Sequence, residues 1–342
     1  MCLALLVLLV LGTVPEADAC TRTLWNSSKL GTYVSRTMDW PVTTEPILAI
    51  LPAGMARDGG VLAGHALGID DPARWTSKYG SFVVQVYGLG AVDGINEKGL
   101  GMHLLYLTVT DFGPRDHTRK GVQAALWGQY ALDQAGTVEE ALALLDGIQP
   151  IMVAHEGMKA TVHLSLEDAA GDSAIIEYVG GERTVHHGRQ YRIMTNDPPY
   201  AEQLAYRAQF DFTGATRQTD IPGNVDPRHR FVRADYYLQM LPEPKSQREA
   251  IAGIMAIARN VSVPFGAPNN LPGTLYNTEY RTAYDLGARM AFFELSTAPS
   301  VIWTSLARFD LTPGAPTRVL DPDDLTLAGD VTDRFKPGTV RF

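Results

Sequence analysis

Cys20 is the residue whose type and position point most directly to chemistry. The chain contains two cysteines, Cys2 and Cys20, and Cys20 follows a segment typical of an export signal. Removal of residues 1–19 would discard Cys2 and leave Cys20 first, with a thiol and a free α-amine on the same residue. An exported protein with one unpaired cysteine is unusual, because oxidising compartments favour disulfides. Because the amine can act as the local base for the thiol, this position predicts a nucleophilic N-terminal cysteine.

The export signal is predicted from three features. Residues 3–12, LALLVLLVLG, are strongly apolar but too short to span a bilayer, which is typical of a secretory signal. Pro15 ends the run, and Ala17–Asp18–Ala19 gives the small-x-small pattern of a cleavage site. We therefore expect cleavage after Ala19 and a secreted or periplasmic mature chain. The first two residues carry no Lys or Arg, which leaves open an upstream start or a buried N-terminal strand or helix.

Lipid attachment at Cys20 is an alternative explanation for the lone thiol. Asp18 and Ala17 replace the apolar and small residues usual in a lipoprotein signal, so the pattern fits this alternative poorly. It would make the chain a lipid-anchored protein that binds ligands without turning them over.

Arg36 and Asp39 are the first candidates to lie near Cys20. TRTLW and TYVSRTMD flank the turn-rich NSSKLG, so residues 20–39 predict a β-hairpin. A turn centred near Ser28 would place Cys20 roughly opposite Arg36. Asp39 is three residues further on and falls on the other face by simple alternation. We therefore expect the strand to end or bulge before Trp40–Pro41 if both side chains serve one site.

The composition limits the classes of partner. The 342 residues carry 29 Lys and Arg against 38 Asp and Glu, a net charge of -9 that does not favour nucleic acid or an anionic membrane. No stable membrane insertion is expected after cleavage. The sequence shows neither a low-complexity segment nor an internal repeat, so residues 20–342 are expected to form a single domain.

The predicted elements run strands, helices, strands, helices, strands. Strand patterns cover 81–87, 102–109, 161–168, 173–179 and 190–196, and three more lie after residue 276. Helical patterns cover 122–135 and much of 200–260, and capping boxes open helices at Thr137–Glu140 and Ser246–Glu249. This order favours an α+β fold in which two packed sheets are covered by helices on both outer faces, not a parallel βαβ fold.

Seven short motifs carry a resemblance to a known family. They occur in the order CTR (20–22), SRTMDW (35–40), WTSKYGS (75–81), DGINEKGLGM (93–102), GDSAIIEY (171–178), MTNDP (194–198) and RFVRADYY (230–237). Together they resemble the choloylglycine hydrolase and penicillin V acylase family, and the Gram-negative branch in particular. The resemblance implies a cysteine hydrolase of the N-terminal-nucleophile (Ntn) class, with an αββα four-layer sandwich of two antiparallel sheets.

The resemblance also implies roles for five side chains. Cys20 resembles the nucleophile, with its α-amine taking and later returning the thiol proton. Arg36 resembles the arginine beside that thiol, and Asp39 the aspartate that orients the α-amine. Asn196 resembles the side-chain donor to the tetrahedral oxyanion, and Arg230 a second active-site arginine. Without the resemblance, Arg36 is equally a solvated strand arginine, and Asp39 and Asn196 are turn residues.

Tyr106 bears on substrate choice. The resemblance implies that its backbone N–H is the second oxyanion donor, whatever its side chain. Bile-salt hydrolases usually have asparagine at this position and penicillin V acylases have an aromatic residue. Tyr106, with Trp40 nearby in the substrate site, therefore favours penicillin V or an acyl-homoserine lactone. A glycine- or taurine-conjugated bile acid stays open as the alternative.

No cofactor is expected, and the expected partner is a small-molecule amide. His186–His187 has no carboxylate or cysteine at ligand spacing, so a metal site is not expected. Arg228 and Arg233 stand close enough to Arg230 to leave the second arginine ambiguous by motif alone. The resemblance implies a possible homotetramer, although the segment between Asn196 and Arg230 is too short for most of the loop that helps bile-salt hydrolases assemble.

Overall fold

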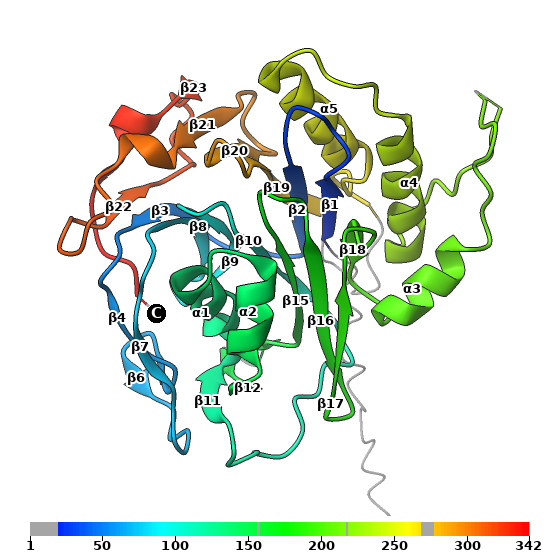
Figure 1. The fold of residues 1–342 in the computed structure, drawn as a ribbon. Coiled ribbons are helices and arrows are strands. Elements are labelled where there is room, and N and C mark those ends of the chain that lie inside the picture. The colour runs from blue at the N-terminus through cyan, green and yellow to red at the C-terminus, as the bar shows by residue number, and fades with distance from the viewer. Residues whose placement is uncertain (1–19, 156–157, 217, 268–276, 342) are drawn as a thin grey trace, which may run out of the picture.

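Two large β-sheets and two groups of helices make up the protein in a computed structural model that describes residues 20–155, 158–216, 218–267 and 277–341 (Figure 1). The predicted export signal lies outside these residues. Within the described part, no helix is long and apolar enough to cross a membrane.

The first sheet, which we call sheet I, contains both strands of the predicted N-terminal hairpin. Its spatial order is β18 (Ile193–Thr195), β1 (Thr21–Trp25), β2 (Tyr33–Trp40), β19 (Asn277–Asp285), β20 (Met290–Leu295), β21 (Ile302–Ser305) and β23 (Gly329–Asp330). Its neighbours are antiparallel except for the β21–β23 pair.

The second sheet, sheet II, is larger and antiparallel throughout. Its order is β17 (Glu182–His187), β16 (Ser173–Val179), β15 (Val162–Glu167), β10 (Gly101–Tyr106), β9 (Gly90–Asn96), β8 (Ser81–Val86), β3 (Ile47–Leu51), β22 (Arg318–Leu320) and β24 (Lys336–Pro337). Four short two-stranded ladders lie outside the sheets: β4 (Ala56–Asp58) with β7 (Arg74–Thr76), β5 (Val61–Leu62) with β6 (His65–Ala66), β11 (Lys120–Gln123) with β12 (Ile148–Ile151), and β13 (Ala154–His155) with β14 (Met158–Lys159).

Each sheet is buried on both faces, which explains the long apolar runs in its strands. In β8, Phe82 and Val84 pack in a core that includes sheet I, whereas Val83 packs in a second core with helices α1 (Trp127–Gln134) and α2 (Val138–Leu145). Because successive side chains of a strand point to opposite faces, this division defines layers. The order is helices, sheet II, sheet I, helices, which is the four-layer sandwich expected from the sequence.

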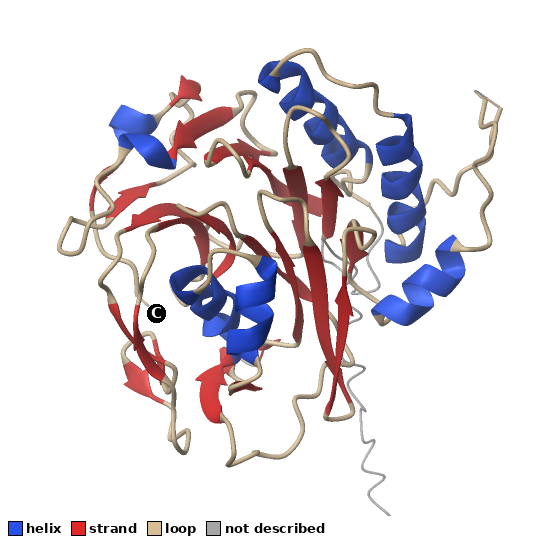
Figure 2. Cartoon of the chain, viewed as in Figure 1, coloured by secondary structure: helices blue, strands red, loops and turns tan. Residues whose placement is uncertain are grey.

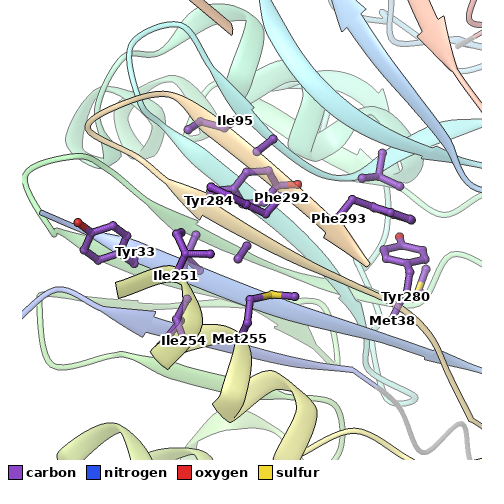
Figure 3. Packing of buried hydrophobic residues seen from close by; sticks show 14 of the residues in the cluster. Tyr33, Met38, Ile95, Ile251, Ile254, Met255, Tyr280, Tyr284, Phe292 and Phe293 are labelled. Carbon is purple, nitrogen blue, oxygen red and sulfur yellow. The ribbon is translucent and has the colours of Figure 1, made fainter. Parts of the chain in front are cut away.

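The helices beside sheet I are α3 (Tyr200–Arg207), α4 (Pro227–Met240) and α5 (Gln247–Asn260), with α4 and α5 against β1, β2, β18 and β19 (Figure 2). Figure 3 shows Ile251, Ile254 and Met255 of α5 among the buried side chains of this core. Two helices, α2 and α5, begin where the capping boxes predict: the hydroxyls of Thr137 and Ser246 accept from the backbone N–H groups of Glu140 and Glu249. Three 3-10 turns complete the described elements, at Ala124–Leu126, Leu306–Arg308 and Thr332–Arg334.

Two of the expected elements differ in detail. Residues 122–123 belong to β11, because that segment pairs in parallel with β12, and the helix begins only at Trp127. The strand expected over 190–196 is β18, which pairs with β1 in sheet I and does not continue the β15–β16 meander. The meander's third strand is β17, which the sequence analysis did not identify.

Candidate active site

The predicted hairpin brings Cys20 and Arg36 together, although not in the expected register. Thr21 is opposite Thr37 and Trp25 opposite Tyr33, so the turn is centred on residue 29 and Cys20 lies opposite Met38. The prediction was therefore wrong by two residues on β2. A two-residue shift keeps the same side chains on the same face, so Arg36 still points toward the thiol. Its Nη2 lies 3.4 Å from Cys20 Sγ, and Met38 Sδ lies 3.7 Å from the same sulfur.

Asp39 contacts a different atom of Cys20, from the opposite face of β2. The backbone nitrogen of Cys20 donates to Asp39 Oδ2 at 2.9 Å. The expected end or bulge between Arg36 and Asp39 is absent, since β2 runs unbroken to Trp40; the irregularity lies on β19, between Thr278 and Tyr280. Cys20 lies at the edge of β1 with a left-handed φ of 67°, so its nitrogen and its sulfur can reach opposite faces of the sheet. Its nitrogen faces the helix layer, and its sulfur faces the space between the sheets.

Of the three neighbouring arginines that the sequence offers, Arg230 is the one that contacts Cys20 and Asp39. Its Nη1 donates to the backbone oxygen of Cys20 and to Thr21 Oγ1, both at 2.7 Å, and lies 3.2 Å from Asp39 Oδ2. Arg228 instead pairs with Asp226 at the start of α4, and Arg233 donates to loop carbonyls. Arg230 therefore fixes the backbone around Cys20 and balances the charge of Asp39.

Asp39 is held firmly as an acceptor. The hydroxyls of Thr37 and Thr278 donate to its two carboxylate oxygens, and its side chain is fully buried. Four donors, from Cys20, β2, β19 and α4, therefore converge on one carboxylate. Such an arrangement holds the carboxylate in a fixed position beside the backbone nitrogen of Cys20.

Asn196 and Tyr106 meet beside the thiol face. Asn196 Nδ2 donates to the Tyr106 carbonyl oxygen at 2.6 Å, which leaves the second N–H of that amide for a ligand. The Leu107 N–H donates to the Thr161 carbonyl oxygen. Because N–H groups alternate in direction along an antiparallel strand, the Tyr106 N–H points away from β15. The pairing of β10 with β9 covers only Gly101–His103, so the Tyr106 N–H is not used in that ladder either. The two groups predicted to bind an oxyanion thus lie together.

Gln203 of α3 supports the Asn196 segment, and the sequence analysis did not identify it. Its Nε2 donates to the carbonyl oxygens of Asn196 and Pro198, both at 2.7 Å, and its Oε1 accepts from the backbone N–H and hydroxyl of Thr195. Gln203 is completely buried. One amide side chain therefore fixes the loop that carries Asn196. The only signal for Gln203 in the sequence is its position in the first turn of a helix that follows a proline pair.

Burial and charge act against each other at the thiol. Burial of Cys20, which is 2% exposed, raises the pKa of the thiol above its usual range. The positive charge of Arg36 acts in the opposite direction, but it does not outweigh the burial. The thiol is therefore protonated at neutral pH, and its attack on a substrate needs a base to accept the proton.

A pocket of about 920 Å³ of empty space, including its open mouth, opens on Cys20 between the two sheets and the β13–β14 ladder. Its lining is almost wholly apolar. It comprises Cys20, Arg36, Met38, Trp40, Thr44, Leu62, Val86, Tyr87, Leu89, Gly90, Val92, Leu104, Tyr106, Ala124, Ala125, Val153, Ala154, Lys159, Ala160 and Val162. The rings of Trp40 and Tyr106 pack with centroids 5.5 Å apart, so the two aromatic residues predicted for the substrate site lie together.

Tyr87 is a third aromatic residue in this pocket, and strand periodicity did not identify it. It follows β8 in a tight turn, Val86 to Leu89, closed by the Leu89 N–H on the Val86 carbonyl at 3.0 Å. Tyr87 and Gly88 have φ values of 53° and 63°, which defines a type I′ turn. A bulky residue rarely occupies this conformation, and here it places a phenol ring in the pocket.

The fold and the grouping of these side chains define the class of protein, a hydrolase of the Ntn fold that acts on linear amide C–N bonds. The family model of "linear amide C-N hydrolases, choloylglycine hydrolase family" matches residues 20–328. The chain belongs to that family.

Relatives and solved structures agree with this assignment. The chain is 34% identical to a penicillin V acylase of Pectobacterium atrosepticum, over 98% of this chain and 94% of the relative. The structure of a penicillin V acylase from Agrobacterium tumefaciens superposes with a TM-score of 0.83 at 35% identity, covering 94% of this chain and 98% of that one. A conjugated bile acid hydrolase from Clostridium perfringens shares the fold, with a TM-score of 0.74 at 17% identity over 88% and 96% of the two chains.

Proposed function

We propose that this chain is an exported amidohydrolase that uses an N-terminal Cys20 and prefers penicillin V, long-chain acyl-homoserine lactones, or both. The observation that carries the proposal is the apolar pocket that opens on the Cys20 sulfur, with Trp40, Tyr87 and Tyr106 in its lining. Such a lining suits a phenoxyacetyl group or an alkyl chain, and burying it contributes about 25 cal/mol per Å² of apolar area. The likeness to two penicillin V acylases supports the same substrate class.

The proposed chemistry begins with the proton of the thiol. Removal of Met1–Ala19 converts the Cys20 nitrogen from an amide into an α-amine, whose ordinary pKa of about 7.7–8.0 suits a base at neutral pH. Asp39, 2.9 Å from that nitrogen, keeps it oriented. As Cys20 Sγ attacks the substrate carbonyl carbon, the thiol proton passes to the amine.

The tetrahedral intermediate then needs donors for its oxygen. The Tyr106 N–H and the free N–H of the Asn196 amide supply them, a contribution of about 3 kcal/mol for one such donor. Collapse breaks the C–N bond, and the ammonium of Cys20 gives its proton to the leaving amine. The acyl group stays on sulfur as a thioester. Water, activated by the amine, hydrolyses the thioester and restores the thiol.

The export proposal and the chemistry are linked, because cleavage after Ala19 creates the base. We propose a secreted or periplasmic location on this ground. Intact mass of the mature protein tests the step: a free Cys20 N-terminus is expected, and a diacylglycerol-modified one would support the lipid-anchored alternative.

A panel of amides tests the substrate class. We expect kcat/KM, measured by released amine, to be higher for penicillin V or a long-chain acyl-homoserine lactone than for glycocholate. The Cys20→Ser variant is the control and should lose nearly all turnover while folding normally, because a hydroxyl is far less acidic than a thiol. Glycocholate as the best substrate would replace the proposal with bile-salt hydrolysis, and an active Cys20→Ser variant would remove the proposed nucleophile.

A further inference from the structure

The space between the two sheets holds charged side chains that the chemistry above does not use. Arg22 and Arg36 are directly opposite each other on β1 and β2, and both are fully buried. Like charges in such a pair repel, and each costs free energy to remove from water. Two buried arginines side by side therefore require anions from another element.

Sheet II supplies those anions from β15 and β9, and the strand between them, β10, supplies a histidine. Glu167 of β15 lies 2.6 Å from Arg22 through Oε2, and its Oε1 lies 2.8 Å from His103 Nε2 of β10. His103 Nδ1 lies 2.7 Å from Asp93 Oδ1 of β9, and Asp93 Oδ2 lies 3.7 Å from Arg36 Nη1. All five side chains are at most 1% exposed. They form a continuous line of alternating charge, which we call the inter-sheet charge line, from Arg22 to the arginine on the thiol.

The surroundings of His103 favour its protonated form. Its Nε2 hydrogen-bonds with Glu167 Oε1, and its Nδ1 lies 2.7 Å from Asp93 Oδ1 as an ion pair without the alignment of a hydrogen bond. Two carboxylates on either side of the ring stabilise the imidazolium. The Tyr284 ring of β19 packs against the imidazole, with centroids 5.9 Å apart. Although burial alone disfavours the imidazolium, Glu167 and Asp93 raise the pKa of His103 to about 9. Three cations against two carboxylates then leave the inter-sheet charge line with one net positive charge, the complement of a thiolate.

Gly101 leaves the space that the Glu167 carboxylate occupies in the inter-sheet charge line. It is paired with Glu167 in the β10–β15 register, and a Cβ at Gly101 would lie 2.3 Å from Glu167 Oε1. The absent side chain lets the Glu167 carboxylate lean along the sheet to His103, two residues further on. Steric room for the Glu167 carboxylate therefore explains why position 101, the second glycine of the NEKGLGM segment, has no side chain.

We propose that Asp93, His103 and Glu167 are positioning residues that hold the Arg36 guanidinium against the Cys20 sulfur, with Arg22 as the fixed far end. The proposal rests on Cys20 being the nucleophile. Apart from the thiol, Arg36 has other contacts, to Tyr280 Oη and Met38 Sδ, both at 3.2 Å, and to the Leu104 carbonyl at 3.3 Å, but all three are neutral. Asp93 is the anion that attracts the guanidinium into the space between the sheets. The positive charge of His103 offsets the negative charge of Asp93, which would otherwise disfavour a thiolate at Cys20.

The test compares two variants with a matched control. His103→Gln removes the central positive charge, and Gly101→Ala adds a methyl group that displaces Glu167 without changing any charge. His163→Gln is the control, since His163 is also a fully buried histidine paired with a carboxylate, Glu177 at 2.8 Å, on the strand next to β10. The first readout is the rate of alkylation of Cys20 by iodoacetamide against pH in the mature protein, which needs no substrate.

We expect alkylation at pH 7 to fall about tenfold in His103→Gln, with its midpoint moved to higher pH, and severalfold in Gly101→Ala. The fall in kcat should match, with KM changed by less than about twofold. His163→Gln should keep the wild-type alkylation profile. Equal profiles in all proteins, or an equal loss in the control, would overturn the proposal.

A measurement on the wild type covers the case in which His103→Gln does not fold. The ¹⁵N shifts of the imidazoles should show one buried histidine doubly protonated at pH 8, and a neutral His103 tautomer there would overturn the proposal. Failure of the proposed function can be distinguished from failure of this proposal. The proposed function fails if Cys20→Ser turns over substrate or if a different amide is preferred. Neither outcome alters the alkylation of Cys20 in the variants.

Discussion

The nitrogen of Cys20 lies 2.9 Å from Oδ2 of Asp39, on the face of β2 that packs toward the helices. The sulfur of the same residue lies on the other face, where the pocket opens. The two groups of the proposed nucleophile are thus held by separate sets of side chains. A substitution can therefore disturb the proton acceptor without moving the thiol.

An N-terminal extension tests this separation. One alanine placed before Cys20 in the mature chain should abolish turnover, because the α-amine becomes an amide that cannot accept a proton. Alkylation of the thiol should stay within about twofold, because Arg36 still faces the sulfur. Edman sequencing and released-amine assays check the result. An extended chain with full turnover would show that another group is the base.

Tyr106→Asn should change substrate preference. The substitution keeps the backbone N–H of Tyr106 but removes the ring that packs on Trp40. We expect kcat/KM for penicillin V to fall about tenfold, since a large part of an aromatic contact surface is lost. The ratio of penicillin V to glycocholate turnover should fall with it. A constant ratio would mean that the ring does not contact the acyl group.

Tyr87→Asn separates the pocket from the turn that carries Tyr87. Asparagine is favoured at this position of a type I′ turn, so thermal stability should be unchanged or slightly higher. Loss of the phenol ring should raise KM severalfold for an aromatic or long acyl substrate with little change in kcat. Gly88 should stay glycine in the variant. A KM equal to that of the wild type would place the acyl group elsewhere in the pocket.

Gln203→Met removes the amide that fixes the Asn196 loop and conserves volume. We expect kcat to fall about tenfold or more, because Asn196 loses its fixed position beside Tyr106. Glu202→Gln, on the exposed neighbouring position of α3, is the control and should behave as the wild type. An unchanged kcat in a folded Gln203→Met variant would show that Asn196 is held by its own contact with Tyr106.

Acid unfolding should report on Glu167. Burial alone would disfavour its carboxylate, but His103 and Arg22 hold its pKa at about 2. Because the folded-state pKa lies below the unfolded value of about 4.3, this group stabilises the fold fully above that pH. The stabilisation is lost as the pH falls toward about 2. Denaturant titrations over this range should show a smaller pH dependence in Glu167→Gln, which is also less stable at pH 7. Equal slopes in the two proteins would contradict this role.

The sequence by itself determined the local parts of the site. The cleavage pattern and the lone thiol single out Cys20, and strand alternation puts Arg36 on the thiol face even though the predicted register was two residues off. Capping boxes located two helix starts. These features depend on short-range rules of periodicity and hydrogen bonding, which a sequence displays directly.

Only the tertiary structure decided what surrounds Cys20. Asp93, His103 and Glu167 come from three strands of sheet II, and no spacing along the chain brings them to Arg36 on sheet I. Tyr87 reaches the pocket through a backbone conformation that aromatic residues rarely adopt, so strand periodicity assigned it wrongly. Strand order and the stacking of two sheets are set by long-range packing, in which many weak contacts are optimised together. A charge line between sheets is a product of that packing, and it exists only once both sheets have formed.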